Sequence, residues 1–238
     1  MQKKLVAIFL MSMLLCGCSN QTDSRIDDLM QVDDIQSNYI ISLQNSISVS
    51  GVSSDEKVIL PKYEKLYKAN TDMIGFIYLD DNHKYPVLMN KDDQNFYLRK
   101  DFFGDDDKAG SIFANVNSSF NQQGISLIYG HNMRSGEKFG TLDEFSVNDI
   151  IQVDSLYEQC TYKVVAIMKT SMHEDFRYYD YVGNLSEKEF STWRKGCQGY
   201  LISGSLSDLT YEDTIIELST CSYHTDDGRL VLILKKEV

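Results

Sequence analysis

TIIELST (Thr214–Thr220), CSYHTDDG (Cys221–Gly228) and RLVLILK (Arg229–Lys235) form one continuous stretch that decides the fold of this chain. The first and third segments are short apolar runs, which are typical of buried strands. The segment between them ends in Asp-Gly, a strong signal for a β-hairpin. If the two runs pair, Cys221 leaves one strand where Arg229 enters the next. We therefore expect the thiol and the guanidinium side by side at one end of a sheet.

Similar short runs, separated by turn residues, continue upstream from this stretch. Eight of them predict a mostly β chain that closes, or nearly closes, into a barrel with added helices. The runs are Gly75–Leu79, Lys84–Leu88, Ser111–Asn115, Ile125–Tyr129, Ile150–Asp154, Thr161–Lys169, Thr214–Thr220 and Arg229–Lys235.

One helix is expected in the connection before the last two strands. Ser186 and Glu189 have the spacing of a capping box, in which each side chain bonds the backbone N–H of the other residue. Apolar residues then recur at helical spacing, and we interpret this stripe as core packing: Phe190, Trp193, Cys197 and Leu201.

Two further helices are predicted near the N-terminus. Steps of three and four residues between apolar positions indicate an amphipathic helix over residues 21 to about 46, and a Ser-rich linker follows to residue 56. Pro61 is suited to the first turn of a second helix, which is expected to run to about Ala69.

The first 20 residues have the features of a targeting segment. Lys3 and Lys4 precede a short apolar run, Leu5–Leu15, which is shorter than the roughly 20 residues that span a bilayer. The sequence LCGCS that follows resembles a lipobox, with Cys18 as the lipidated residue. We expect a lipid tether at Cys18, with an uncleaved membrane anchor as the alternative. The predicted domains are thus a leader (1–20), a helical stalk and linker (21–56) and a catalytic domain (57–238).

Composition limits the function further. The chain has 238 residues and a net charge of −12, which argues against nucleic acid as a partner. No spacing of Cys and His residues fits a metal site, and no cofactor is implied. Cys160 and Cys197 are interpreted as two buried thiols, although a disulfide between them is an alternative in an exported protein.

Three residues have the chemistry needed for covalent acyl transfer. Cys221 supplies a nucleophilic thiol, and Arg229 supplies a rigid cation that can stabilise an oxyanion. His131 follows the run Ile125–Tyr129, so it too is expected at a strand end, as the proton carrier. His224 is the rival for this role because it is close to Cys221 in sequence. Structural thiols and solvated arginines are common, so the case rests on the three residues occurring together.

The order of short motifs resembles the sortase family, most closely class B. The resemblance covers roughly residue 63 to the C-terminus. The matching segments are NTDMIGFI (Asn70–Ile77), YPV (Tyr85–Val87), FYL (Phe96–Leu98), GSIF (Gly110–Phe113), YGHNM (Tyr129–Met133), KFGTL (Lys138–Leu142) and LSTC (Leu218–Cys221).

This resemblance implies a function and a set of partners. A cysteine transpeptidase would cleave a C-terminal sorting signal, with an Asn-Pro-x-Thr type expected, and pass the acyl group to an amine of a peptidoglycan precursor or a pilin. It would act as a monomer tethered to the outer face of the membrane. Asn132, Thr220, Ser222 and Tyr223 are expected to contact the peptide. The alternatives are an exported lipoprotein that binds peptides without turnover, and a cysteine peptidase that hydrolyses the thioester.

Overall fold

The computed structural model describes residues 21–30 and 57–237. The predictions for residues 1–20 and 31–56, lipidation of Cys18 among them, lie outside the described residues. Helix α1 (Gln21–Met30) buries Ile26 and forms a salt bridge of 2.9 Å between Arg25 and Asp101. Within the described ranges, no helix has the length and apolar character needed to cross a bilayer.

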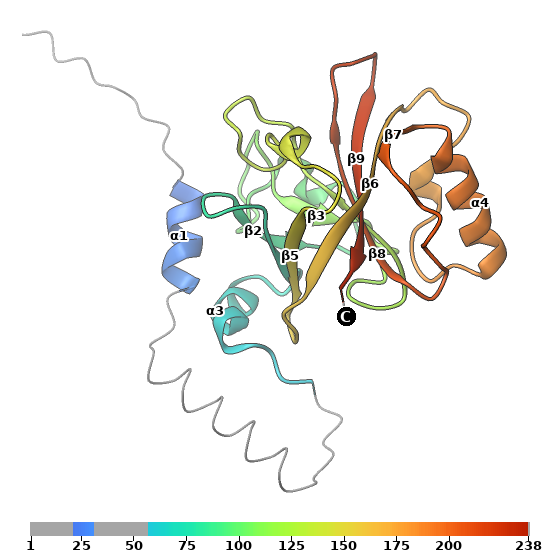
Figure 1. The fold of residues 1–238 in the computed structure, drawn as a ribbon. Coiled ribbons are helices and arrows are strands. Elements are labelled where there is room, and N and C mark those ends of the chain that lie inside the picture. The colour runs from blue at the N-terminus through green and yellow to red at the C-terminus, as the bar shows by residue number, and fades with distance from the viewer. Residues whose placement is uncertain (1–20, 31–56, 238) are drawn as a thin grey trace, which may run out of the picture.

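The strands form one nine-stranded sheet (Figure 1), in the order β5-β1-β2-β3-β4-β8-β9-β6-β7. A further pairing, β5 with β6, closes eight of the nine strands into a barrel. The bounds are β1 (Met73–Tyr78), β2 (Lys84–Leu88), β3 (Ile112–Ala114), β4 (Gly124–Tyr129), β5 (Ile150–Ser155), β6 (Thr161–Ser171), β7 (Leu201–Gly204), β8 (Thr214–Cys221) and β9 (Gly228–Lys236).

Strand β6 explains both the closure and the extra strand. One of its edges pairs with β9 along most of its length. Its other edge pairs first with β5, through Thr161–Lys163, and then with β7, through Ala166–Met168. The eight-stranded barrel predicted from the sequence is therefore confirmed, and β7 is an additional strand beside it.

Sequence reasoning missed β7 because Leu201 continues the apolar stripe of the preceding helix. That helix, α4 (Glu187–Gln198), ends three residues earlier, and Leu201 instead starts the strand. Its side chain still packs on the same cluster as the helix. A short, mostly exposed strand has little apolar pattern to reveal it.

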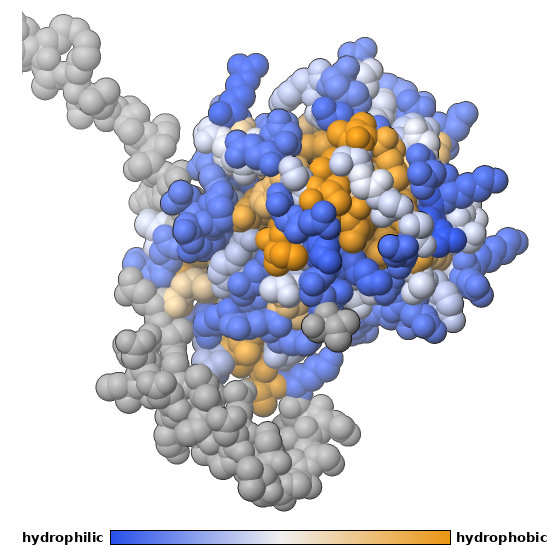
Figure 2. Space-filling model, viewed as in Figure 1, coloured by the Kyte–Doolittle hydropathy of each residue, from blue (hydrophilic) through white to orange (hydrophobic). Residues whose placement is uncertain are grey.

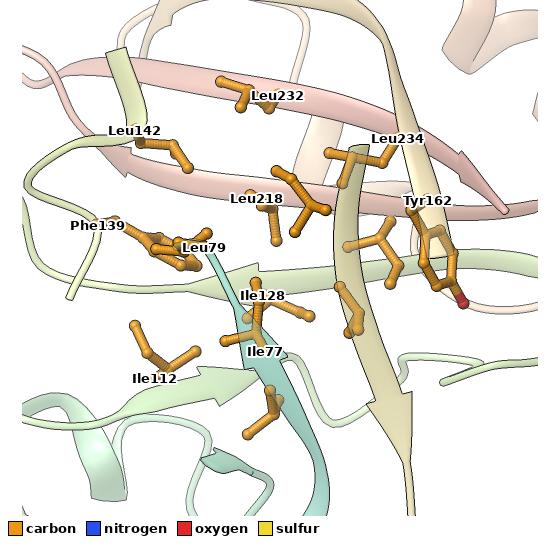
Figure 3. Close-up of a cluster of buried hydrophobic side chains, with 14 of the residues drawn as sticks. Ile77, Leu79, Ile112, Ile128, Phe139, Leu142, Tyr162, Leu218, Leu232 and Leu234 are labelled. Carbon is orange, nitrogen blue, oxygen red and sulfur yellow. The ribbon is translucent and has the colours of Figure 1, made fainter. Parts of the chain in front are cut away.

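The barrel interior is a continuous apolar core. Side chains from strands on all sides of the barrel point inward and meet at its centre (Figure 3). Strand β8 contributes Ile216 and Leu218 to this core, both fully buried. Other members include Ile77, Leu79, Ile112, Ile128, Phe139, Leu142, Tyr162, Leu232 and Leu234.

Helix α4 covers the outside of the barrel and forms a second apolar layer with it (Figure 1). Its predicted capping box is present, with both the Ser186 and the Glu189 side chains bonded to backbone N–H groups. Phe190, Trp193 and Cys197 are buried against β4, β8 and β9. The solvent side of the helix is hydrophilic, as Figure 2 shows for that side of the molecule.

Helix α3 (Pro61–Ala69) lies at the end of the barrel opposite the β8–β9 turn (Figure 1), and its bounds match the prediction. The buried carboxylate of Asp154 in β5 anchors it. Asp154 accepts hydrogen bonds from Lys62 Nζ at 2.7 Å and from the Tyr63 hydroxyl at 2.6 Å. These bonds hold helix α3 against the barrel, away from the predicted site. The remaining short helices are the 3-10 turns η1 (Phe96–Arg99), η2 (Leu142–Glu144) and η3 (Tyr178–Asp180).

Candidate active site

Strand register brings the three predicted catalytic residues together. Strands β4 and β8 are parallel and pair Tyr129 with Ser219, so His131 and Cys221 each lie two residues beyond that pair. Strands β8 and β9 are antiparallel and pair Cys221 directly with Arg229. The thiol therefore stands between the histidine and the arginine at one end of three adjacent strands.

These residues line a common pocket of about 310 Å³. Cys221 is exposed to solvent there, while His131 and Arg229 are half-buried. Thr220 also lines the pocket, and further walls come from Leu98, Tyr129, Met172, Tyr178 and Tyr179. A larger hollow, about 1280 Å³, lies beside α3 and contains none of the predicted site residues.

The imidazole of His131 is oriented by one hydrogen bond. Its Nε2 atom lies 2.8 Å from the backbone oxygen of Leu98. A carbonyl oxygen can only accept, so Nε2 carries a hydrogen and donates it. This leaves Nδ1 as the ring nitrogen that can exchange a proton with other groups, a division of roles common for histidine.

The guanidinium of Arg229 is fixed by the turn that precedes it. Nη1 donates to the backbone oxygens of Asp227, at 3.1 Å, and Gly228, at 2.9 Å. Asp227 has a positive φ of 46°, which turns the chain tightly enough for this contact. Because arginine has five N–H donors, a guanidinium held at one corner retains donors for a ligand.

Two hydrogen bonds tie the end of β4 to the end of β8. Asn132 Nδ2 donates to the backbone oxygen of Cys221 at 2.8 Å, and Thr220 Oγ1 donates to the backbone oxygen of Gly130 at 2.7 Å. These bonds fix the histidine segment relative to Cys221. Thr220 and Asn132, both predicted to contact a peptide, thus also hold the site itself in place.

Tyrosines from the connection between β6 and β8 form one wall of the pocket. The hydroxyl of Tyr178, in η3, is 2.7 Å from Ser219 Oγ on β8. Burial raises the pKa of the Tyr178 phenol well above its usual value, so it remains neutral. Sequence reasoning did not assign Tyr178 or Tyr179 to the site. The tyrosine-rich run FRYYDY (Phe176–Tyr181) is the feature that could have indicated this wall. It was missed because strand pairing alone does not determine the path of a long connection.

Other predicted residues lie outside the pocket lining. Ser222 Oγ is 2.9 Å from Nδ1 of His224, and Tyr223 is 79% exposed. The carboxylate of Asp227 is 3.2 Å from His173 Nε2, so its contact with Arg229 is through the backbone only. The pocket contains His131 and not its rival His224.

The remaining two thiols, Cys160 and Cys197, lie in different apolar clusters. Both are free and buried, so the prediction of two buried thiols is confirmed. Over residues 21–30 and 57–237, no group of three or more His, Cys, Asp or Glu side chains is arranged to hold a metal ion.

Comparison with known proteins points to one family. Residues 81–237 match the model of the Sortase domain family. Sortase B of Staphylococcus aureus is 27% identical over 196 residues, covering 77% of this chain and 78% of that protein. Sortase B of Listeria monocytogenes is 28% identical over 177 residues, covering 70% of each chain.

Solved structures share the fold. The Staphylococcus aureus sortase B–substrate complex superposes with a TM-score of 0.67 at 22% identity, over 91% of this chain and 96% of that chain. A Bacillus anthracis protein described as similar to sortase B gives 0.65 at 24% identity, over 87% of this chain and 98% of that chain.

Proposed function

The chain belongs to the sortase family, and from this premise we propose that it is a class B-like cysteine transpeptidase in which Cys221, His131 and Arg229 carry out the chemistry. The observation that carries the proposal is the register of three strands. Cys221 ends the middle one of these strands, with His131 beyond one neighbouring strand and Arg229 on the other, and all three residues line one pocket. Each group matches one need of acyl transfer: nucleophile, proton carrier and oxyanion donor.

The first half of the reaction forms an acyl-enzyme. The Cys221 thiolate attacks the carbonyl carbon of a threonine in the sorting signal, and the carbonyl oxygen becomes an oxyanion. Arg229 donates hydrogen bonds to this oxyanion. As the carbon–nitrogen bond breaks, the leaving amine takes the Nδ1 proton of His131. A thioester on Cys221 and a free amine-terminated fragment result.

The second half transfers the acyl group to a new amine. His131 Nδ1 takes a proton from the incoming amine as its nitrogen attacks the thioester carbon. The Cys221 thiolate then leaves, and an amide bond replaces the thioester. Amine must outcompete water for this step. The pocket walls formed by Leu98, Tyr178 and Tyr179 are an advantage because they restrict solvent access from their side of the thioester.

The finer assignments belong to the same proposal. The sorting signal is of the Asn-Pro-x-Thr type, and the amine comes from a peptidoglycan precursor or a pilin. Thr220 is the predicted peptide contact best supported by its place in the pocket, ahead of Asn132, Ser222 and Tyr223. The enzyme acts as a monomer on the outer face of the membrane, tethered by lipid at Cys18 or by an N-terminal anchor.

A cysteine peptidase is the second candidate, and the exposure of Cys221 favours it because water can also reach the thioester. Product analysis separates the two. The protein is incubated with an Asn-Pro-Gln-Thr-containing peptide, with and without an amine acceptor, and the products are identified by mass spectrometry. A new amide in the presence of amine supports transfer. A free carboxyl product alone, at every amine concentration, would identify a peptidase.

Paired histidine variants assign the proton carrier in the same assay. His131→Gln should remove turnover, whereas the matched His224→Gln should retain it, because His224 bonds Ser222 outside the pocket. The reverse result would transfer the role to His224. Absence of any product across a panel of sorting peptides, from a folded protein, would favour the peptide-binding lipoprotein.

A further inference from the structure

The side of β8 that bears the nucleophile also bears a buried carboxyl. Alternate residues of a strand share a face, so Ile215, Glu217, Ser219 and Cys221 point outward. Ile216 and Leu218, between them, point into the barrel core. Ile215 is packed in the layer under α4. Trp193 contacts the next outward residue, Glu217, and Tyr178 contacts the one after it, Ser219. Glu217 therefore lies on the catalytic face, four residues before the thiol.

Glu217 is fully buried and has one hydrogen bond. Trp193 Nε1, from α4, donates to Oε1 at 2.9 Å. Oε2 has no hydrogen-bond partner among the described residues. A buried carboxyl with an unpartnered oxygen is costly, and far more so when it is charged.

The surroundings of Glu217 contain no cation bonded to it. From α4 the neighbouring titratable group is the Cys197 thiol, from η3 it is the Tyr178 phenol, and from β4 it is the Tyr129 phenol. The positive charge of Arg229, from β9, favours the ionised forms of the two phenols. Within the described part of the chain, Glu217 has no salt bridge. Burial without a cationic partner raises the pKa of Glu217 to about 8, although the hydrogen bond from Trp193 favours the charged form. The carboxyl is therefore a neutral acid at pH 7.

The bond from Trp193 is one of two that hold the pocket wall on the catalytic strand. The other joins Tyr178, in η3, to Ser219. Trp193 and Tyr178 pack in one apolar cluster under α4, so a shift of the helix is transmitted to η3. Tyr178 and its neighbour Tyr179 line the pocket directly. The packing of α4 on β8 is thus linked through this cluster to the tyrosines beside Cys221.

We propose that Glu217 is a positioning residue, which keeps the α4–η3 wall seated on the catalytic strand through Trp193 and does so only as the neutral acid. Ionisation places an unpaired charge in an apolar layer, and the layer relieves this cost by opening to water. The wall then moves away from Cys221, and peptide binding weakens. The proposal gives the site an alkaline limit that is independent of the three reacting groups. Its activity readout rests on the proposed function, whereas its structural readout does not.

Trp193 makes the structural readout direct, because it is the one tryptophan in the 238-residue chain. The fluorescence of the full chain carrying Cys221→Ala, which removes the nucleophilic thiol, is titrated from pH 6.5 to 9.0, which ends about one unit below the ordinary pKa of tyrosine. A transition with a midpoint near pH 8 is expected, and it should be absent when Glu217→Gln is added. Glutamine keeps the acceptor oxygen but cannot ionise. Glu187 is an exposed carboxyl on α4, the helix that bears Trp193. Glu187→Gln is the matched control and should leave the transition in place.

The activity readout uses the same substitutions with Cys221 intact. Each protein's kcat/KM for peptide cleavage is normalised to its own value at pH 7. The Glu217→Gln to wild-type ratio should rise about tenfold by pH 9, because a group titrating near 8 is then about nine-tenths ionised. The Glu187→Gln ratio should stay at one.

Failure of this inference is distinct from failure of the proposed function. A flat fluorescence titration of the Cys221→Ala protein would overturn the role of Glu217 even if the enzyme transfers acyl groups normally, and this arm stands even if Glu217→Gln does not fold. An identical transition in folded Glu217→Gln would also overturn it. A Glu217-dependent transition in a protein without peptide turnover would retain the ionisable seat of α4 while the transpeptidase proposal failed.

Discussion

The two faces of strand β8 present opposite kinds of chemistry. The inner face places Ile216 and Leu218 in a barrel core made of apolar side chains. The outer face places Glu217, Ser219 and Cys221 in line under α4 and η3, where the first two are each hydrogen-bonded to an aromatic side chain of the wall. The side chain of Cys221 opens into the pocket.

This difference teaches which part of the sequence can vary and which cannot. An apolar core is specified by volume and pattern, so similar side chains can replace one another at modest cost. A buried polar layer is specified by individual partners, and each partner lost leaves an unsatisfied group. Function should therefore be sensitive to the outer face and stability to the inner face, and the following substitutions test that division.

The largest effect is expected at the end of the outer face. Arg229→Lys keeps the charge but replaces the planar fork with a flexible ammonium, so the oxyanion loses its fixed donors. We expect kcat to fall by roughly 10²–10³-fold, as for loss of an oxyanion-hole donor. The half-buried side chain should cost little in folding, so the thermal midpoint should stay near that of wild type. Wild-type turnover in Arg229→Lys would remove Arg229 from the chemistry.

A second substitution probes the inner face. Leu218→Ala deletes buried methyl groups from a side chain that is 0% exposed. It should lower the free energy of unfolding by about 2–5 kcal/mol, measured by denaturant titration. The activity of the molecules that remain folded should change little, since no atom of Leu218 lines the pocket. A large loss of kcat in the molecules that remain folded would contradict the division between the two faces.

The pH dependence of stability also sharpens the comparison. Unfolded Glu217 loses its proton near its ordinary pKa of 4.5, whereas the folded chain keeps it to about 8. Between these values the folded state binds more protons than the unfolded state, so stability falls as pH rises, by about 1.4 kcal/mol per pH unit. Glu217→Gln removes this loss. Its stability relative to wild type should therefore increase from pH 5 to pH 8 and then level off.

The matching control is Glu187→Gln, whose exposed side chain has no comparable desolvation to relieve. Denaturant titrations at three pH values measure both variants against wild type. A constant difference for Glu217→Gln across this range would show that the carboxyl is not held neutral in the folded chain.

Local pattern in the sequence was enough to predict the barrel and the pairing of Cys221 with Arg229. Apolar runs gave the eight barrel strands, and the hairpin signal at Asp227-Gly228 predicted that Cys221 and Arg229 are neighbours, as the register confirms. His131 needed more than pattern, since its position depends on the parallel pairing of β4 with β8. The family motif supplied what local reasoning did not.

The outer layer could not be predicted in the same way. Glu217 interrupts an apolar run, and its burial depends on a helix that ends 19 residues earlier in the chain. Tyr178 reaches Ser219 across 41 residues of sequence. Such contacts follow from the path of a long connection, which apolar periodicity does not determine. The missed strand β7 belongs to that same connection.

The central claim is that Cys221 is the nucleophile of an acyl transfer, and intact mass spectrometry tests it most directly. Protein beginning at Gln21 is mixed with an Asn-Pro-Gln-Thr-containing peptide and sampled before and after an amine is added, beside Cys221→Ala. We predict an adduct of the peptide's acyl portion on wild type only, lost on addition of the amine as the amide product appears. An adduct on Cys221→Ala, or none on a folded wild type whose thiol remains open to alkylation, would contradict the account.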